Sequence, residues 1–301
     1  MKKFLSVLMA GAMLFGVLTL AGCGDTTTDT GEDTTTTEDT TTTAEFTTVT
    51  EGVLTMSTNA AFPPYEMTDD TGAVVGIDAE IAAAIAEKLG LELEILDMDF
   101  DGALAAPQSG KSDIVMAGVT VNEERQLVLD FSNTYANGVQ KVIVAEGSDI
   151  TMENLGEQQI GTQKGTTGNI LTTDEFGEDH VIAYDDAIAA VQALNNGQID
   201  CVVIDSAVAD NLVEANPGLT TLDTDYANEE YAIGVAKGNT ALLDAINTAL
   251  QELIDDGTVQ SIIDKYIPTD GTAADEAGTT DEAGATDEAG ATDGAEADTA
   301  A

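Results

Sequence analysis

The chain has 301 residues, and its 56 acidic side chains against nine basic ones give a formal net charge of −47 at neutral pH. A nucleic-acid-binding protein needs a basic surface, so this balance excludes that class and argues against docking of the folded part on anionic lipid. A single histidine, His180, and two cysteines without a Cys-x-x-Cys motif offer no pattern for a metal site. We therefore expect no metal and no cofactor.

The chain begins with two lysines, a long apolar run and then small residues, which is the pattern of a secretory signal. The run is near transmembrane length, but its end, Leu20-Ala21-Gly22-Cys23, resembles the bacterial lipobox and favours cleavage over a membrane span. The resemblance implies a signal peptide over 1–22 and a lipidated Cys23 that anchors the protein to the outer face of the cell membrane.

Two segments have too few apolar side chains to offset the entropy of ordering the backbone. Residues 23–48 are mostly Thr, Asp, Glu and Gly, and residues 269–301 repeat Thr-Asp-Glu-Ala-Gly-Ala with slippage. We expect a disordered stalk after the anchor and a disordered acidic tail. The folded part is then 49–268, which has 39 acidic and seven basic residues and a net charge of −32.

Short apolar runs alternate with helical spacing along this folded part. Strands are predicted at 53–57, 91–96, 113–117, 159–162, 181–184, 200–204 and 231–236. Helices are predicted over 78–89 with Gly90 as the stop, after Phe100, from Asn122, from within 165–169, over 185–194, from Asp205, over 239–256 and over 257–266. The alternation predicts an α/β fold with two parallel-type sheets covered by helices, in two lobes of about 100 residues each. Cys201 lies in one apolar strand, and we expect it to be buried and outside any disulfide.

Several sequence blocks recur in a fixed order. They are NAAFPPYE at 59–66, GIDAEI at 76–81, MDFDG at 98–102, AGVT at 117–120, ER at 124–125, DFS at 130–132 and GTT at 165–167. Together they resemble bacterial extracellular solute-binding family 3, the polar amino-acid-binding proteins of ABC importers, over 50–268. One departure is Ile77, where the family usually has an aromatic residue.

The resemblance implies a type II periplasmic-binding-protein-like fold, in which two α/β lobes are joined by two hinge strands and close on a ligand. It places lobe 1 at 49–135 and 237–268, and the hinges and lobe 2 at 136–236, with hinges near Tyr135–Gly138 and Glu230–Ile233. The implied function is non-enzymatic: a monomer captures an amino acid and delivers it to the permease and ATPase of an importer.

Arg125 is the only arginine in the chain. A planar guanidinium can return two parallel charge-assisted bonds to a carboxylate that leaves water, whereas lysine offers a point charge. The resemblance implies that Arg125 clamps the ligand α-carboxylate. The alternative is a surface arginine that pairs with Glu123 or Glu124.

The resemblance also implies partners for both ends of the ligand. Asp205 is expected to take the α-ammonium, aided by the Gly118 carbonyl and the Thr120 hydroxyl. Thr166 and Thr167, at the start of a helix in the other lobe, are expected to meet the carboxylate through their N–H groups. The alternative for Asp205 and for the Gly165–Gly168 turn is an ordinary helix N-cap.

For the ligand side chain, the resemblance implies a sandwich between Phe62 and Phe100, with core packing as the alternative. Asn59 stands where relatives that bind cationic side chains often have an acid, which argues against lysine or arginine as the ligand. The lack of a second arginine argues against an acidic ligand, so a neutral amino acid is favoured. Two other functions stay open: an enzyme on the same fold, such as a dehydratase or lytic transglycosylase relative, and a ligand sensor for a membrane signalling partner.

Overall fold

The computed structural model describes residues 46–223 and 225–268, all within one compact unit of the chain. The predicted signal peptide, Cys23, the acidic tail and nearly all of the predicted stalk lie outside the described residues. Within the described ranges, the search for a helix long and apolar enough to span a membrane finds none.

Lobe 1 is built around three parallel strands. The strand β1 (Val53–Thr58) pairs with β5 (Glu92–Asp97) on one side and with β6 (Ile114–Val115) on the other. The helices of this lobe are α1 (Ile77–Leu89), α2 (Phe100–Ala105), α6 (Thr240–Asp255) and α7 (Thr258–Tyr266). The helix α1 ends as predicted because Gly90 adopts the left-handed conformation, with φ of 70°.

Lobe 2 repeats the arrangement with a second parallel set, which contains β8 (Ile160–Gln163), β9 (Val181–Tyr184) and β10 (Cys201–Asp205). The short β11 (Leu219–Thr221) is antiparallel to its neighbour in the sheet. Its helices are α3 (Thr167–Phe176), α4 (Ala187–Asn195) and α5 (Ser206–Ala215). Cys201 is fully buried and is a free thiol, as predicted.

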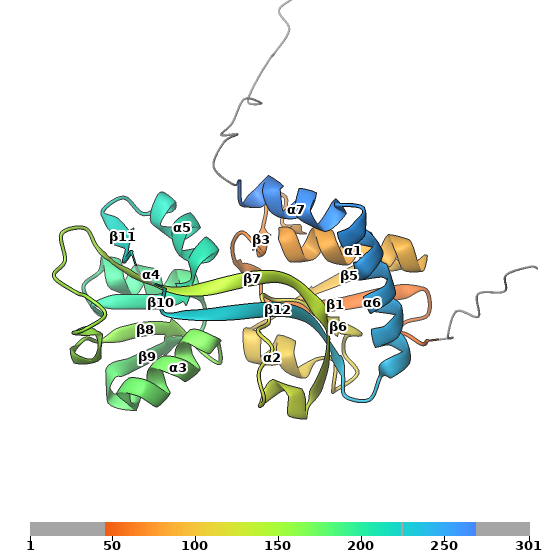
Figure 1. The fold of residues 1–301 in the computed structure, drawn as a ribbon, viewed down its shortest axis with the longest axis horizontal. Helices are drawn as coiled ribbons and strands as arrows, with labels where there is room; N and C mark the ends of the chain where they lie inside the picture. The colour runs from red at the N-terminus through yellow and green to blue at the C-terminus, as the bar shows by residue number, and fades with distance from the viewer. Residues whose placement is uncertain (1–45, 224, 269–301) are drawn as a thin grey trace, which may run out of the picture. The chain divides into compact units, whose positions relative to one another are not determined.

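Two long antiparallel strands, β7 (Leu129–Ala145) and β12 (Ala227–Ala236), pass from one lobe to the other (Figure 1). Because they pair with β6 in lobe 1 and with β10 and β11 in lobe 2, the strands form one mixed sheet of order β5-β1-β6-β12-β7-β10-β8-β9. The predicted α/β class is confirmed, but one continuous sheet replaces the two separate sheets. The predicted hinge segments are neighbours in it, with Tyr231 opposite Ala136 and Glu230 opposite Asn137.

A small second sheet was not predicted. It contains β2 (Ala61–Phe62), β3 (Glu66–Thr68) and β4 (Val74–Val75), and it leads directly into α1. The backbone N–H groups of Ile77 and Asp78 donate to the carbonyls of Pro64 and Tyr65. Gly76 permits this approach, since a Cβ there would lie 2.3 Å from the Tyr65 oxygen. The contact brings Glu66 of β3 next to the first turn of α1.

The helix predicted from Asn122 is wrong. The chain makes only a 3-10 turn, η1 (Arg125–Leu127), before β7 begins at Leu129. The Asn122 side chain accepts from the Arg125 N–H at 2.8 Å, so it starts a turn, and the strand that follows leaves no room for a helix. Two further 3-10 turns are η2 (Leu155–Glu157) and η3 (Glu178–His180), so His180 lies in a turn rather than an irregular loop.

Candidate functional site

A small cavity of about 20 Å³ lies where the two lobes and the two crossing strands meet. Eight of the nine predicted ligand-binding residues line it: Asn59, Phe62, Phe100, Gly118, Thr120, Arg125, Thr166 and Thr167. Asp205 does not. Six further lining residues were not predicted: Glu66, Ala117, Gln140, Gln163, Glu229 and Tyr231. How each of these residues would act on a ligand stays a prediction.

Arg125 is buried at the edge of the cavity, and only 7% of its surface is exposed. Its Nη1 donates to the Thr120 carbonyl of lobe 1 at 2.8 Å, and its Nη2 donates to the Gly165 carbonyl of lobe 2 at 3.1 Å. The guanidinium also lies 5.3 Å from the centre of the Phe100 ring. Burial lowers the pKa of Arg125 from its ordinary value, yet a guanidinium remains charged at neutral pH. The alternative of a surface arginine is therefore wrong.

Glu229, near the start of β12, is an acid that shares a hydrogen-bond partner with Arg125. Its carboxylate accepts from the Thr120 hydroxyl at 2.6 Å and from the Gln140 amide at 2.5 Å. Thr120 thus joins the two charges, since its carbonyl accepts from Arg125 and its hydroxyl donates to Glu229. The cavity is therefore lined by a cation and an anion that are bridged by one residue, Thr120.

Asp205 lies behind this group and is fully buried. One carboxylate oxygen caps α5 by accepting from the N–H groups of Ala207 and Val208, at 2.8 and 3.2 Å. The other accepts from the Tyr231 hydroxyl at 2.9 Å. Burial raises the pKa of Asp205 to about 6. The N-cap alternative is thus in place, and Glu229 lines the cavity whereas Asp205 does not.

The turn before α3 faces lobe 1 across the cavity. Thr166 is the N-cap of α3, where its hydroxyl accepts from the Asn169 N–H, as the capping alternative predicts. The Thr167 hydroxyl donates to the Thr120 hydroxyl at 2.8 Å, which is a contact between the lobes. Asn59 makes another, because its side-chain oxygen accepts from the Gln163 amide at 2.8 Å. The lobes are therefore in direct contact around the cavity.

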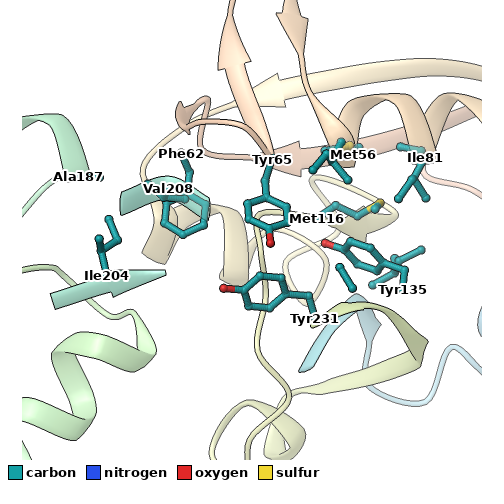
Figure 2. Packing of buried hydrophobic residues seen from close by; sticks show 14 of the residues in the cluster. Met56, Phe62, Tyr65, Ile81, Met116, Tyr135, Ala187, Ile204, Val208 and Tyr231 are labelled. Atoms are coloured by element: carbon teal, nitrogen blue, oxygen red, sulfur yellow. The ribbon is translucent and has the colours of Figure 1, made fainter. Parts of the chain in front are cut away.

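Three aromatic side chains, Phe62, Tyr65 and Tyr231, pack against one another at one side of the cavity. Phe62 stacks on Tyr65 with ring centres 5.9 Å apart, and Tyr65 meets Tyr231 edge to face at 5.2 Å (Figure 2). Gly118 is required opposite Phe62, since a Cβ there would come within 2.9 Å of the Phe62 ring. Phe62 and Phe100 are nine-tenths buried and also border the cavity, so core packing and contact with a ligand are compatible.

Glu66 is fully buried beside Asp78 of α1. The Asp78 carboxylate accepts from the Gly118 N–H at 2.9 Å and from the Tyr135 hydroxyl at 2.7 Å. Burial raises the pKa of Asp78 to about 6, even though these two hydrogen bonds and a third with the Glu66 side chain oppose the shift. Burial and the Asp78 charge raise the pKa of Glu66 well above its ordinary value.

These raised pKa values predict that the ligand-free protein is more stable in mild acid. Glu66, Asp78 and Asp205 bind protons more tightly when folded than when unfolded, so stability falls as pH rises from about 4 through 6. We expect Tm to be several degrees higher at pH 5 than at pH 7.5, at about 2–4 °C per kcal/mol. Thermal unfolding monitored by circular dichroism tests this, and Asp205→Asn should reduce the difference. A Tm that rises from pH 5 to pH 7.5 would contradict it.

No ligand-binding role was predicted from the sequence for Gln140, Gln163, Glu229 or Tyr231, nor for Glu66, although Glu66 ends the block NAAFPPYE. The two acids are hidden among 56, and each glutamine lies in a strand where it resembles any other polar residue. Within the described ranges, no group of three or more His, Cys, Asp or Glu side chains is arranged to hold a metal ion.

The chain was compared with known proteins. The family model described as bacterial extracellular solute-binding proteins, family 3, matches residues 54–269. A probable histidine-binding protein of Neisseria gonorrhoeae is 29% identical over 282 residues, which cover 91% of this chain and 98% of the relative. The L-cystine-binding protein TcyJ of Escherichia coli (strain K12) is 31% identical over 225 residues, which cover 73% and 85%.

Solved structures match the fold as well. The solved structure of an ancestral arginine-binding protein bound to arginine superimposes with a TM-score of 0.68 at 40% identity, covering 72% of this chain and 98% of that one.

Proposed function

Because this chain belongs to the bacterial extracellular solute-binding proteins of family 3, we propose that it captures a free amino acid between its lobes and delivers it to the permease of an ABC importer. The family is one of solute-binding proteins with the two-lobed type II fold, and its members work outside the cytoplasm. The relatives named for histidine, cystine and arginine support an amino acid as the solute.

The observation that carries the proposal is the link from Arg125 through Thr120 to Glu229. The carboxylate and ammonium of a free amino acid are attached to the same carbon, so a complementary site must hold a cation and an anion close together. Such a pair returns charge-assisted hydrogen bonds to both ends of the zwitterion when it leaves water. We assign the α-carboxylate to Arg125 and the α3 N-terminus, and the α-ammonium to Glu229, with Asp205 behind it.

Closure of the lobes is the proposed source of selectivity. Thr120 and Arg125 belong to lobe 1, whereas Gly165 and Thr167 belong to lobe 2, and the bonds between them exist only when the lobes meet. A ligand that bonds to both sides therefore favours the closed state. In this proposal 49–135 and 237–268 form lobe 1, 136–236 form lobe 2 with the hinges, and the paired strands at Tyr135–Gly138 and Glu230–Ile233 bend.

A thermal-shift panel of the free amino acids tests the function. A ligand present at one hundred times its Kd should stabilise the protein by about 2.7 kcal/mol. We expect a concentration-dependent rise in Tm with at least one L-amino acid and none with the corresponding amino-acid amide, which lacks the α-carboxylate. A panel in which no amino acid raises Tm contradicts the proposed function.

Attachment to the membrane is proposed through Cys23, on the strength of the lipobox resemblance. The protein would then work as a monomer beside its permease. The enzyme and sensor alternatives gain no specific support from any feature of residues 46–223 and 225–268.

A further inference from the structure

Unsatisfied acceptor oxygens gather in the cavity. Six buried side-chain atoms lack a hydrogen-bond partner within the described part of the chain, and four of them belong to cavity-lining residues. They are both carboxylate oxygens of Glu66 and the side-chain oxygens of Gln140 and Gln163. Leaving a buried acceptor unpaired is costly, so the cluster indicates a ligand that supplies several donors.

The orientation of both amides follows from their partners. The Gln140 nitrogen faces the Glu229 carboxylate, which can only accept, so the Gln140 oxygen is the free atom. The Asn59 nitrogen donates to the Met98 carbonyl, which leaves the Asn59 oxygen as the acceptor for the Gln163 nitrogen. The Gln163 oxygen is therefore free as well. Both glutamines and Glu66 thus line the cavity and carry unpaired acceptors.

The charges in the cavity favour one class of side chain. Arg125 is the single cationic residue among those that line it, and Glu229 and Glu66 are the acids. Arg125 and Glu229 are matched by the carboxylate and ammonium of any amino acid. Glu66 remains, and a cationic side chain is its complement. Two free carboxylate oxygens fit the parallel N–H groups of a guanidinium, whose five donors suit the surrounding amide oxygens.

Resting on the proposed function, we infer that Glu66 receives the cationic side chain of the ligand, with arginine the best fit, and releases a proton as the ligand binds. This replaces the expectation of a neutral ligand, in which the argument against a cationic side chain rested on Asn59. In the structure the Asn59 side chain is already hydrogen-bonded to Met98 and Gln163.

Glu66 has a proton to release because other acids surround it. Asp78 of α1 is the nearest charge, Asp205 and Asp97 add to it, and Tyr65 and Tyr135 are the neighbouring phenols. Two adjacent buried carboxyls do not both ionise easily. Asp78 accepts from Gly118 and Tyr135, whereas Glu66 accepts from no donor, so in the empty protein the proton belongs on Glu66, whose carboxyl then donates to Asp78. A cation in the cavity reverses that preference.

The first test compares L-arginine with L-citrulline, which has nearly the same shape but a neutral side chain, by isothermal titration calorimetry. Arginine should bind at least tenfold more tightly at pH 7.5. Because binding releases a proton, its affinity should rise with pH between 5 and 8 by up to about tenfold per unit. Titrations in buffers of different ionisation enthalpy should show nearly one proton released near pH 6.

The second test uses Glu66→Gln in the full chain. Glutamine has the shape of a protonated glutamate, so the fold should be kept, as circular dichroism can verify. Arginine affinity should fall roughly 30-fold or more, and proton release should disappear. The matched control is Glu94→Gln, which removes an exposed carboxylate of β5 in the same lobe and should change neither quantity.

The outcomes separate this inference from the proposed function. Preference for citrulline or another neutral amino acid, or arginine binding without proton release, overturns the role of Glu66 and leaves amino-acid capture standing. Unchanged arginine affinity in Glu66→Gln overturns the role as well. Failure to bind any amino acid overturns both.

Discussion

Replacing Arg125 by lysine is expected to abolish most of the amino-acid affinity while the protein stays folded. The guanidinium donates to carbonyls of both lobes and has further N–H groups for the α-carboxylate, whereas an ammonium can reproduce only part of this geometry. Weakening a buried, hydrogen-bonded charge pair costs about 2–5 kcal/mol, which corresponds to a loss of roughly 30-fold to several thousand-fold. Calorimetric titration with the ligand found in the panel measures the loss.

The control for Arg125→Lys is Lys111→Ala, which removes an exposed cation from the same lobe and should leave affinity unchanged. The ligand-free Tm of Arg125→Lys should stay close to that of the original protein, because the positive charge is retained. Equal affinity in the two variants would exclude the carboxylate role of Arg125.

Replacing Glu229 by glutamine should be nearly as damaging, and it should affect every amino acid regardless of side chain. The carboxylate borders the cavity and is oriented by Thr120 and Gln140, so its charge is held where the α-ammonium would lie. Glutamine keeps the shape but removes the charge, and the expected cost is again about 2–5 kcal/mol. Citrulline and arginine should lose affinity by similar factors, unlike in Glu66→Gln.

Asp205→Asn is the matched comparison for Glu229→Gln. Asparagine can still cap α5 through its side-chain oxygen, and its amide nitrogen can donate to the Tyr231 hydroxyl oxygen, so the fold should survive. If Glu229 is the direct partner of the ammonium, Asp205→Asn should have the smaller effect on affinity. A larger effect of Asp205→Asn would restore the role that the sequence assigned to Asp205.

Much of the fold was predictable because local signals agree with it. The helix before Gly90 and the helix that Asp205 caps follow from apolar spacing and from stop and start residues. The strand β7 was missed because Asn133, Gly138 and Gln140 interrupt its apolar pattern. Gln140 borders the cavity and Gly138 lies in the predicted hinge, whereas the Asn133 N–H donates to the Asn247 side chain of α6.

The candidate site was predictable as far as the resemblance reached. Arg125, Thr120 and the turn at Gly165 meet at one cavity, although 40 residues separate Arg125 from Gly165. Glu66 and Glu229 were missed because their importance depends on what surrounds them after folding. Glu66 ends a block that the sequence analysis singled out, but its burial beside Asp78 appears only after folding, and so do the bonds of Glu229 to Thr120 and Gln140.

The hydrogen bonds around the cavity belong to two groups, those within the two crossing strands and those between the lobes. Gln140, Glu229 and Tyr231 all lie on β7 and β12, and the bonds among them stay within that pair of strands. The bond from Arg125 to Gly165 instead requires both lobes. An arriving ligand would therefore first contact the anionic group on β7 and β12, which is already assembled in the open protein. This first contact would govern the association rate. The bonds between the lobes form later and set the dissociation rate.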